Sequence, residues 1–235
     1  MDDRGLLDSL LADVTTVTEI VRSSPREPVA HCPGWSVADL VDHHGEVLRW
    51  AARIVDSGER VGEEFRGPSD VTELADWYTA GAQEFVSVAR SVDRDRACWT
   101  FGGPPGKTWF WIRRQALEAA IHRWDAEFAI GRPGGFPTGV ASAGITEVVE
   151  DFFPRQIALL RSTGLSAAVA LHATDSDEGW ILGRDRGADP VAVVKGPAAV
   201  LFLLLWRRTN VDDHRVEYSG PAELARAIRA TRFAP

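Results

Sequence analysis

The chain has 235 residues, of which 45% are hydrophobic, enough for one large domain or two small ones, and we expect two. Its formal net charge is −8 and its arginines are scattered, so we expect no nucleic-acid partner, because such a partner requires a basic patch. The acidic start MDDRG lacks the basic and apolar regions of a secretory signal, and we expect a cytoplasmic protein.

Apolar residues at helical spacing predict four amphipathic helices in the first 130 residues. They are residues 4–22, a helix that starts near Val37, a helix that starts after Asp70, and residues 109–130. Ser36 and Asp39 have the spacing of a capping box, with aspartate in place of the usual glutamate. Four such helices before the Gly/Pro-rich GRPGG favour a helix bundle.

The second half of the chain has a different pattern. A helical stretch at residues 140–161 contains Pro154, which we expect to kink or divide it. Short apolar segments between turn residues then predict strands at residues 167–174, 179–184, 190–196 and 214–220. Two helices are expected between and after them, at residues 197–208 and 221–231. The apolar run 198–206 is about half as long as a bilayer requires, so we expect no membrane association.

These elements predict an α+β protein with two domains. A helical domain is expected at residues 1–164, with its bundle core at 1–130 and a connecting helix after it. A small α+β domain is expected at residues 165–235.

Three side chains on two of the predicted helices suggest a metal site. Glu118 and His122 are four residues apart, so they project toward the same spot. His43 shares the helix face of Leu40 and Val47, whereas His44 lies about 100° away, so His43 is the better inward candidate. Two imidazoles and one carboxylate suit zinc and leave one coordination position open, as in catalytic sites.

Other interpretations of these residues remain open. A Glu–His pair at this spacing also occurs on solvated helix faces, and a histidine on an apolar face is often simply hydrogen-bonded. Asp125 could orient the imidazole of His122, or it could be exposed and paired with Arg123 or Arg132. His44 could form a polar contact or be exposed.

The chain has two cysteines, Cys32 and Cys98, without the spacing of a disulfide framework or a zinc finger. We expect both thiols to be reduced, and we interpret Cys32 as structural because it belongs to the helix-start segment CPGW. A reactive thiol would then come from outside the protein.

Two segments, CPGWSVADLVDHHGEVLRWA (residues 32–51) and RRQALEAAIHRWDAE (residues 113–127), resemble the signature segments of the mycothiol-dependent maleylpyruvate isomerase family. GPAAVLFLLLWRR (196–208) and VEYSGPAELARAI (216–228) are more faintly similar to its carboxy-terminal domain. The resemblance implies a DinB-like four-helix bundle, a small α+β domain, and a divalent metal, usually zinc. By residue, it places that metal on His43, Glu118 and His122. The chain departs from many relatives at Leu117, where they have histidine, and at His44, where they have leucine.

The resemblance also implies mycothiol as a thiol cofactor and an electrophilic small molecule as substrate. The thiolate on the metal would add to a cis double bond, permit rotation, and leave to give the trans product. If the substrate carries a carboxylate, arginine is its natural partner, which makes Arg207 and Arg208 the candidates. Their alternative role is that of solvent-facing charges near a helix C-terminus.

Two further functions fit the same residues. One is a mycothiol S-transferase that detoxifies electrophiles, and the other is a non-catalytic protein that binds a metal or a small ligand. The sequence pattern leaves both open, together with the oligomeric state.

Overall fold

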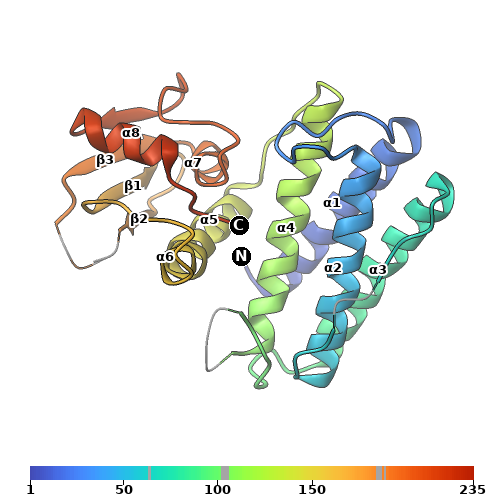
Figure 1. Ribbon diagram of the computed structural model, residues 1–235. Coiled ribbons are helices and arrows are strands. Elements are labelled where there is room, and N and C mark those ends of the chain that lie inside the picture. The colour runs from blue at the N-terminus through green and yellow to red at the C-terminus, as the bar shows by residue number, and fades with distance from the viewer. Residues whose placement is uncertain (63–64, 102–105, 184–186, 188) are drawn as a thin grey trace. The chain divides into compact units, whose positions relative to one another are not determined.

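Four long helices make up the first unit of the chain, Met1–Gly135 (Figure 1). They are α1 (Asp3–Ser23), α2 (Val37–Ser57), α3 (Val71–Ser91) and α4 (Thr108–Ala129). Each begins within one residue of its predicted start, and together they confirm the predicted bundle. The computed structural model describes residues 1–62, 65–101, 106–183, 187 and 189–235.

Local hydrogen bonds explain why two of these starts could be predicted. The Ser36 hydroxyl accepts a hydrogen bond from the Asp39 amide at 3.3 Å, and the Asp39 carboxylate accepts one from the Ser36 amide at 2.8 Å. This reciprocal pair is the predicted capping box of α2. At α3, the Asp70 side chain accepts from the next amides, those of Thr72 and Glu73.

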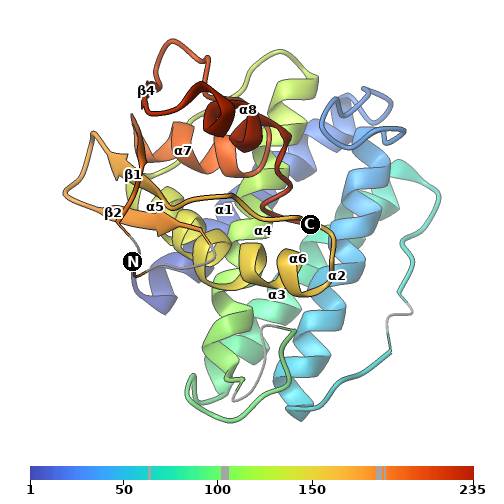
Figure 2. The ribbon, with the colours of Figure 1, turned by 60° about the vertical axis from the view of Figure 1, so that its left-hand side comes forward.

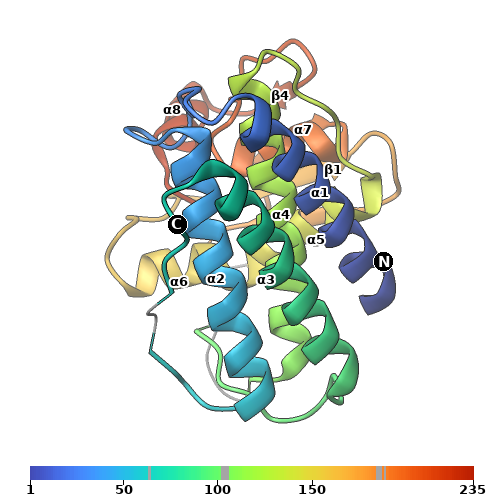
Figure 3. The ribbon, with the colours of Figure 1, turned by 90° about the vertical axis from the view of Figure 1, so that its right-hand side faces the viewer.

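Two neighbouring helices of the bundle, α2 and α3, point the same way (Figure 3). Helices α1 and α2 each pack against both α3 and α4. Most residues of helix α4 are buried, and they include the polar residues Gln115, His122 and Asp125.

The second unit, Phe136–Pro235, starts with one continuous helical run, drawn in yellow tones in Figure 2. It consists of α5 (Thr138–Glu147), the π-helical segment η1 (Val148–Phe152) and α6 (Phe153–Ala158). Proline lacks an amide hydrogen and crowds the carbonyl four residues earlier, so it disturbs regular α-helical bonding before it. The π-helical segment just before Pro154 is therefore the form that the expected division of this helix takes.

A four-stranded sheet follows, with the strand order β2-β1-β3-β4. The strands are β1 (Val169–Ala173), β2 (Gly179–Leu182), β3 (Ala192–Gly196) and β4 (Glu217–Ser219). Strands β1 and β3 are parallel, with Val169 opposite Ala192, and the outer pairs are antiparallel. All four predicted strands are present, although Arg184, at the end of the second, lies outside the described residues.

Two short helices complete the second unit, α7 (Ala198–Leu205) and α8 (Ala222–Ala230), as predicted. Nearly all of α7 is buried, because it packs against α5, β1 and β3. The protein thus has the predicted mixed α+β architecture, a helical bundle followed by a small sheet with helices. Within the described parts of the chain, no helix is long and apolar enough to cross a membrane.

The helices between Thr138 and Ala158, expected as a connection that belongs to the helical domain, group with the second unit by packing. This grouping describes their contacts in the folded protein, and it does not test whether they fold together with the bundle or with the sheet. The domain boundary near residue 165 therefore stays a prediction.

Candidate metal centre

Helix α4 presents Glu118 and His122 one turn apart. Their facing atoms, Glu118 Oε1 and His122 Nε2, are 3.9 Å apart. Helix α2 supplies His43, whose ring centroid lies 6.0 Å from that of His122. One donor atom from each of these three residues lies within 4.8 Å of the other two. The structure therefore brings together the three side chains that helical spacing selected.

The donor set fits a zinc ion. Burial lowers the pKa of His43 below its usual value and outweighs the opposing effect of Glu118, so its imidazole is neutral near pH 7, the form that binds metal. Two ligands of one tetrahedral zinc ion lie about 3.4 Å apart, so only a small side-chain adjustment separates these donors from a binding geometry. The pattern is two imidazoles and a carboxylate, with room for a further ligand.

A buried arginine borders the same site. Arg114 Nε lies 3.6 Å from Glu118 Oε2, on the other side of the carboxylate from His122, and Arg114 is only 3% exposed. The guanidinium group therefore attracts the carboxylate of Glu118 from the side opposite His122. Leu117, one of the departures from the resembling family, is fully buried next to Glu118 in α4.

His44 is the more buried of the two adjacent histidines. It is 0% exposed, and its Nδ1 atom lies 2.8 Å from the hydroxyl of Tyr78 on α3. Burial, reinforced by the nearby His122 and His43, lowers its pKa far below the usual value, so it is a neutral imidazole. The alternative of an exposed His44 is therefore wrong, and burial alone would not have identified His43 as the donor near Glu118.

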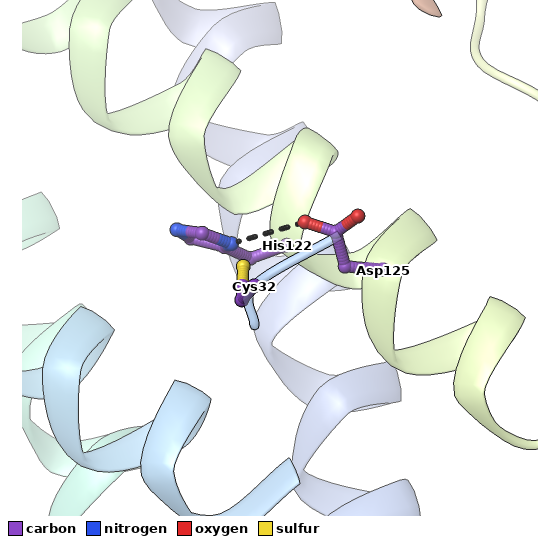
Figure 4. Close-up of side chains that lie close together, drawn as sticks. All are labelled: Cys32, His122 and Asp125. Carbon is purple, nitrogen blue, oxygen red and sulfur yellow. Dashed lines mark ion pairs between the residues drawn. The ribbon is translucent and has the colours of Figure 1, made fainter. Parts of the chain in front are cut away.

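The second nitrogen of His122 faces a different set of side chains (Figure 4). His122 Nδ1 lies 3.5 Å from Asp125 Oδ2, and His31 Nδ1 lies 3.6 Å from Asp125 Oδ1. Asp125 is 0% exposed, so the alternative of a solvent-exposed aspartate is wrong. Its position fits the orienting role, in which a carboxylate fixes the tautomer of a metal-binding histidine.

Cys32 reaches the same place from the connection between α1 and α2. Its amide donates a hydrogen bond to the Val29 carbonyl, and its carbonyl accepts one from the Trp35 amide, both at 3.0 Å. Its thiol, however, lies within 4.8 Å of donor atoms of His122 and Asp125. Sequence spacing does not contain this proximity, because it depends on how the connection folds over α4.

Two family models match the chain. The Mycothiol maleylpyruvate isomerase N-terminal domain matches residues 7–127, more than half of the chain, and the MDMPI C-terminal domain matches residues 140–227. The chain belongs to the mycothiol-dependent maleylpyruvate isomerase family. Among curated proteins, no sequence matches this chain.

Two solved structures share the fold of this family member. One is the crystal structure of the mycothiol-dependent maleylpyruvate isomerase, with 14% sequence identity, coverage of 93% of both chains and a TM-score of 0.66. The other is a histidine-to-alanine mutant of that enzyme, with the same identity and coverage and a TM-score of 0.65. At this identity the likeness establishes the architecture of both units.

The two arginines proposed to bind a carboxylate belong to the second unit of this family member. Arg207 and Arg208 follow α7 and line a pocket of about 320 Å³ together with Arg229. Arg207 has a positive φ of 61°, and Arg208 donates a hydrogen bond to the Trp206 carbonyl at 2.9 Å. Their contact with a substrate stays a prediction.

Proposed function

We propose that this protein is a mycothiol-dependent enzyme that isomerises a cis double bond in a small electrophilic substrate, with a divalent ion, zinc by preference, held by His43, Glu118 and His122. The observation that carries the proposal is the meeting of these donors from two helices inside a bundle of this family. A cytoplasmic location and a small-molecule substrate belong to the same proposal.

The side chains around the site have separate tasks. A bound divalent ion would supply Lewis acidity, which makes the thiolate form of a thiol available near neutral pH. His43 contributes a neutral imidazole because burial lowers its pKa. Asp125 Oδ2 lies 3.5 Å from His122 Nδ1, where its negative charge favours the tautomer with the proton on Nδ1 and the lone pair on Nε2, which faces Glu118. Arg114 Nε lies 3.6 Å from Glu118 Oε2 and helps to hold this carboxylate in place.

A carboxylated substrate would need a cationic partner. The planar guanidinium of arginine binds carboxylates through two parallel hydrogen bonds. Arg207 and Arg208 are our candidates for this role, because both line a pocket that already contains a third arginine. If they bind the substrate, Arg207→Ala and Arg208→Ala should raise KM for a dicarboxylate more than they lower kcat.

The proposal is tested by supplying the zinc-loaded protein with mycothiol and maleylpyruvate. We expect the cis substrate to disappear, the trans product to accumulate, and mycothiol to be regenerated. Glu118→Gln should lower turnover by more than about 100-fold, because even changes outside the ligand set commonly cost 10 to 100-fold at metal sites. Glu84→Gln makes the same change at an exposed position of α3 and should leave turnover unaltered.

The amount of mycothiol consumed for each product formed distinguishes an isomerase from the two alternative functions. A mycothiol S-transferase consumes one mycothiol for each product, whereas an isomerase returns it. A binding protein takes up metal or thiol saturably and converts neither. Consumption of mycothiol, or binding without turnover of maleylpyruvate, would contradict the proposed isomerisation.

A further inference from the structure

The imidazole of His122 stands between two different groups of donors. Its Nε2 atom faces Glu118, within the group described above. Its Nδ1 atom faces Asp125, and Figure 4 shows the Cys32 sulfur beside this same ring nitrogen. Donor atoms of Cys32, His122 and Asp125 all lie within 4.8 Å of one another. A thiol, an imidazole and a carboxylate therefore converge on the side of the ring away from Glu118.

One distance within this second group matches the distance between two ligands of a metal ion. The separation of 3.5 Å between His122 Nδ1 and Asp125 Oδ2 exceeds the usual N–H···O distance of about 2.7 to 3.2 Å. It is close to the distance of about 3.4 Å expected between two nitrogen or oxygen ligands of one tetrahedral zinc ion. A cation between these atoms would have both as ligands.

A second observation points to a ligand at the same place. His122 is only 8% exposed, and its Nδ1 atom is buried and makes no hydrogen bond among the described residues. A buried polar atom left without a partner costs free energy, on the order of 1 to 3 kcal/mol. This atom points toward Asp125 and the thiol of Cys32, so a cation there would supply the missing partner (Figure 4).

We propose that Cys32, His122 and Asp125 form a second binding site, for a thiophilic divalent cation such as zinc, on the opposite side of the His122 ring from Glu118. The sulfur ligand distinguishes it chemically from the first group, which offers only nitrogen and oxygen. Thiolate ligands favour zinc and similar soft or borderline cations over magnesium or calcium.

Sharing of His122 makes the two sites compete. A neutral imidazole has one nitrogen lone pair, and its other nitrogen carries the proton. A cation bound through Nδ1 therefore withdraws Nε2 from the site with His43 and Glu118. The second site can be measured most clearly in a protein whose first site has been weakened.

Cobalt(II) is the probe, because a thiolate ligand adds an ultraviolet charge-transfer band that nitrogen and oxygen ligands do not produce. In Glu118→Gln, which removes a ligand of the first site only, we expect about one cobalt per chain and a clear thiolate band. The double variant Glu118→Gln/Cys32→Ser should lose the band and bind cobalt at least about 10-fold more weakly. Asp125→Asn in the Glu118→Gln background should also weaken the band.

Cys98 provides the matched control. It is the other cysteine of the chain, is 5% exposed, and directs its sulfur toward the carbonyl of Ile54 at 3.5 Å. Glu118→Gln/Cys98→Ser should keep the thiolate band. If Glu118→Gln fails to fold by circular dichroism, His43→Ala serves as the background, because it too weakens only the first site.

The proposal is overturned if a folded first-site variant binds no cobalt, binds it without a thiolate band, or keeps the band after Cys32→Ser. Each of these results leaves the proposed isomerase untouched, because that function is read from mycothiol-dependent turnover of the wild-type protein. Conversely, a thiolate band in Glu118→Gln from a protein without turnover would support the second site alone.

Discussion

Adjacent histidines on α2 show how one step along a helix changes the role of a side chain. His43 lies close to Glu118 and His122 of α4. His44 is buried inside the bundle, where its Nδ1 atom contacts the hydroxyl of Tyr78 on α3. The pairing of Glu118 with His122, and the choice of His43, could be predicted because both follow from helical spacing. The proximity of Cys32 and His31 to Asp125 could not, because it depends on the path of an irregular connection.

Tyr78→Phe tests the buried contact with His44. Both residues are 0% exposed, and the phenol hydroxyl is 2.8 Å from His44 Nδ1. Its removal leaves that nitrogen without a partner, so we expect the free energy of unfolding to fall by about 1 to 3 kcal/mol. Urea denaturation measures the change. An unchanged midpoint would mean that the hydrogen bond does not form.

Asp13 should make stability depend on pH. Its carboxylate pairs with Arg123 Nε at 2.7 Å, but burial outweighs this pairing and raises its pKa from 3.8 to about 6. The folded protein therefore holds the proton more tightly than the unfolded chain. Protonated Asp13 therefore contributes to the free energy of unfolding. This contribution is fully present below about pH 4 and is lost as the pH rises through about 6.

Asp13→Asn removes this titration. We expect the difference in unfolding free energy between wild type and Asp13→Asn to change by up to about 3 kcal/mol from pH 4 to pH 7, with the wild type losing stability relative to the variant as pH rises. Urea denaturation across this range is the measurement. Parallel pH profiles for the two proteins would contradict the raised pKa.

Among the elements, helix starts were predicted most accurately, because capping side chains act within three or four residues. Ser36 and Asp70 mark their helices in the sequence and make the corresponding hydrogen bonds in the structure. The π-helical segment η1 was not predicted in this form, since Pro154 indicates a disturbance without specifying how the backbone absorbs it. The pairing of parallel strands β1 and β3 likewise requires contacts distant in the chain.

Ser36→Ala tests the capping box of α2. The change removes the hydroxyl that accepts from the Asp39 amide, and we expect a loss of about 0.5 to 2 kcal/mol in stability. Ser91→Ala is the control, because that hydroxyl is exposed and donates to the carbonyl of Val88 near the end of α3. Equal midpoints of urea denaturation for the two variants would show that the capping box does not stabilise the protein.

Gly144→Ala tests the close packing of α5 against α7. A Cβ atom at Gly144 would lie 2.3 Å from the Phe202 ring, so we expect overpacking to cost about 1 to 3 kcal/mol despite the better helix propensity of alanine. Gly5→Ala in α1 is the control, since its Cβ would meet mainly the flexible end of Met1. Thermal unfolding should separate the two variants, and equal effects would contradict the close contact.

At the scale of the whole molecule, the family assignment covers both units and accounts for their succession in the chain. The cofactor and the reaction class that we propose follow from the family. The residues that we propose as metal ligands are donors on α2 and α4. The choice of substrate depends on pocket walls rather than on the fold, which is why the sequence predicted the architecture further than the specificity.

Anomalous scattering at the zinc edge, from crystals of the zinc-loaded protein, tests the central claim most directly. With zinc at about one equivalent, the account predicts the strongest peak within bonding distance, about 2.0 to 2.2 Å, of donor atoms of His43, Glu118 and His122. A fully loaded protein whose zinc touches none of these three residues, or one that takes up no zinc at all, would contradict it.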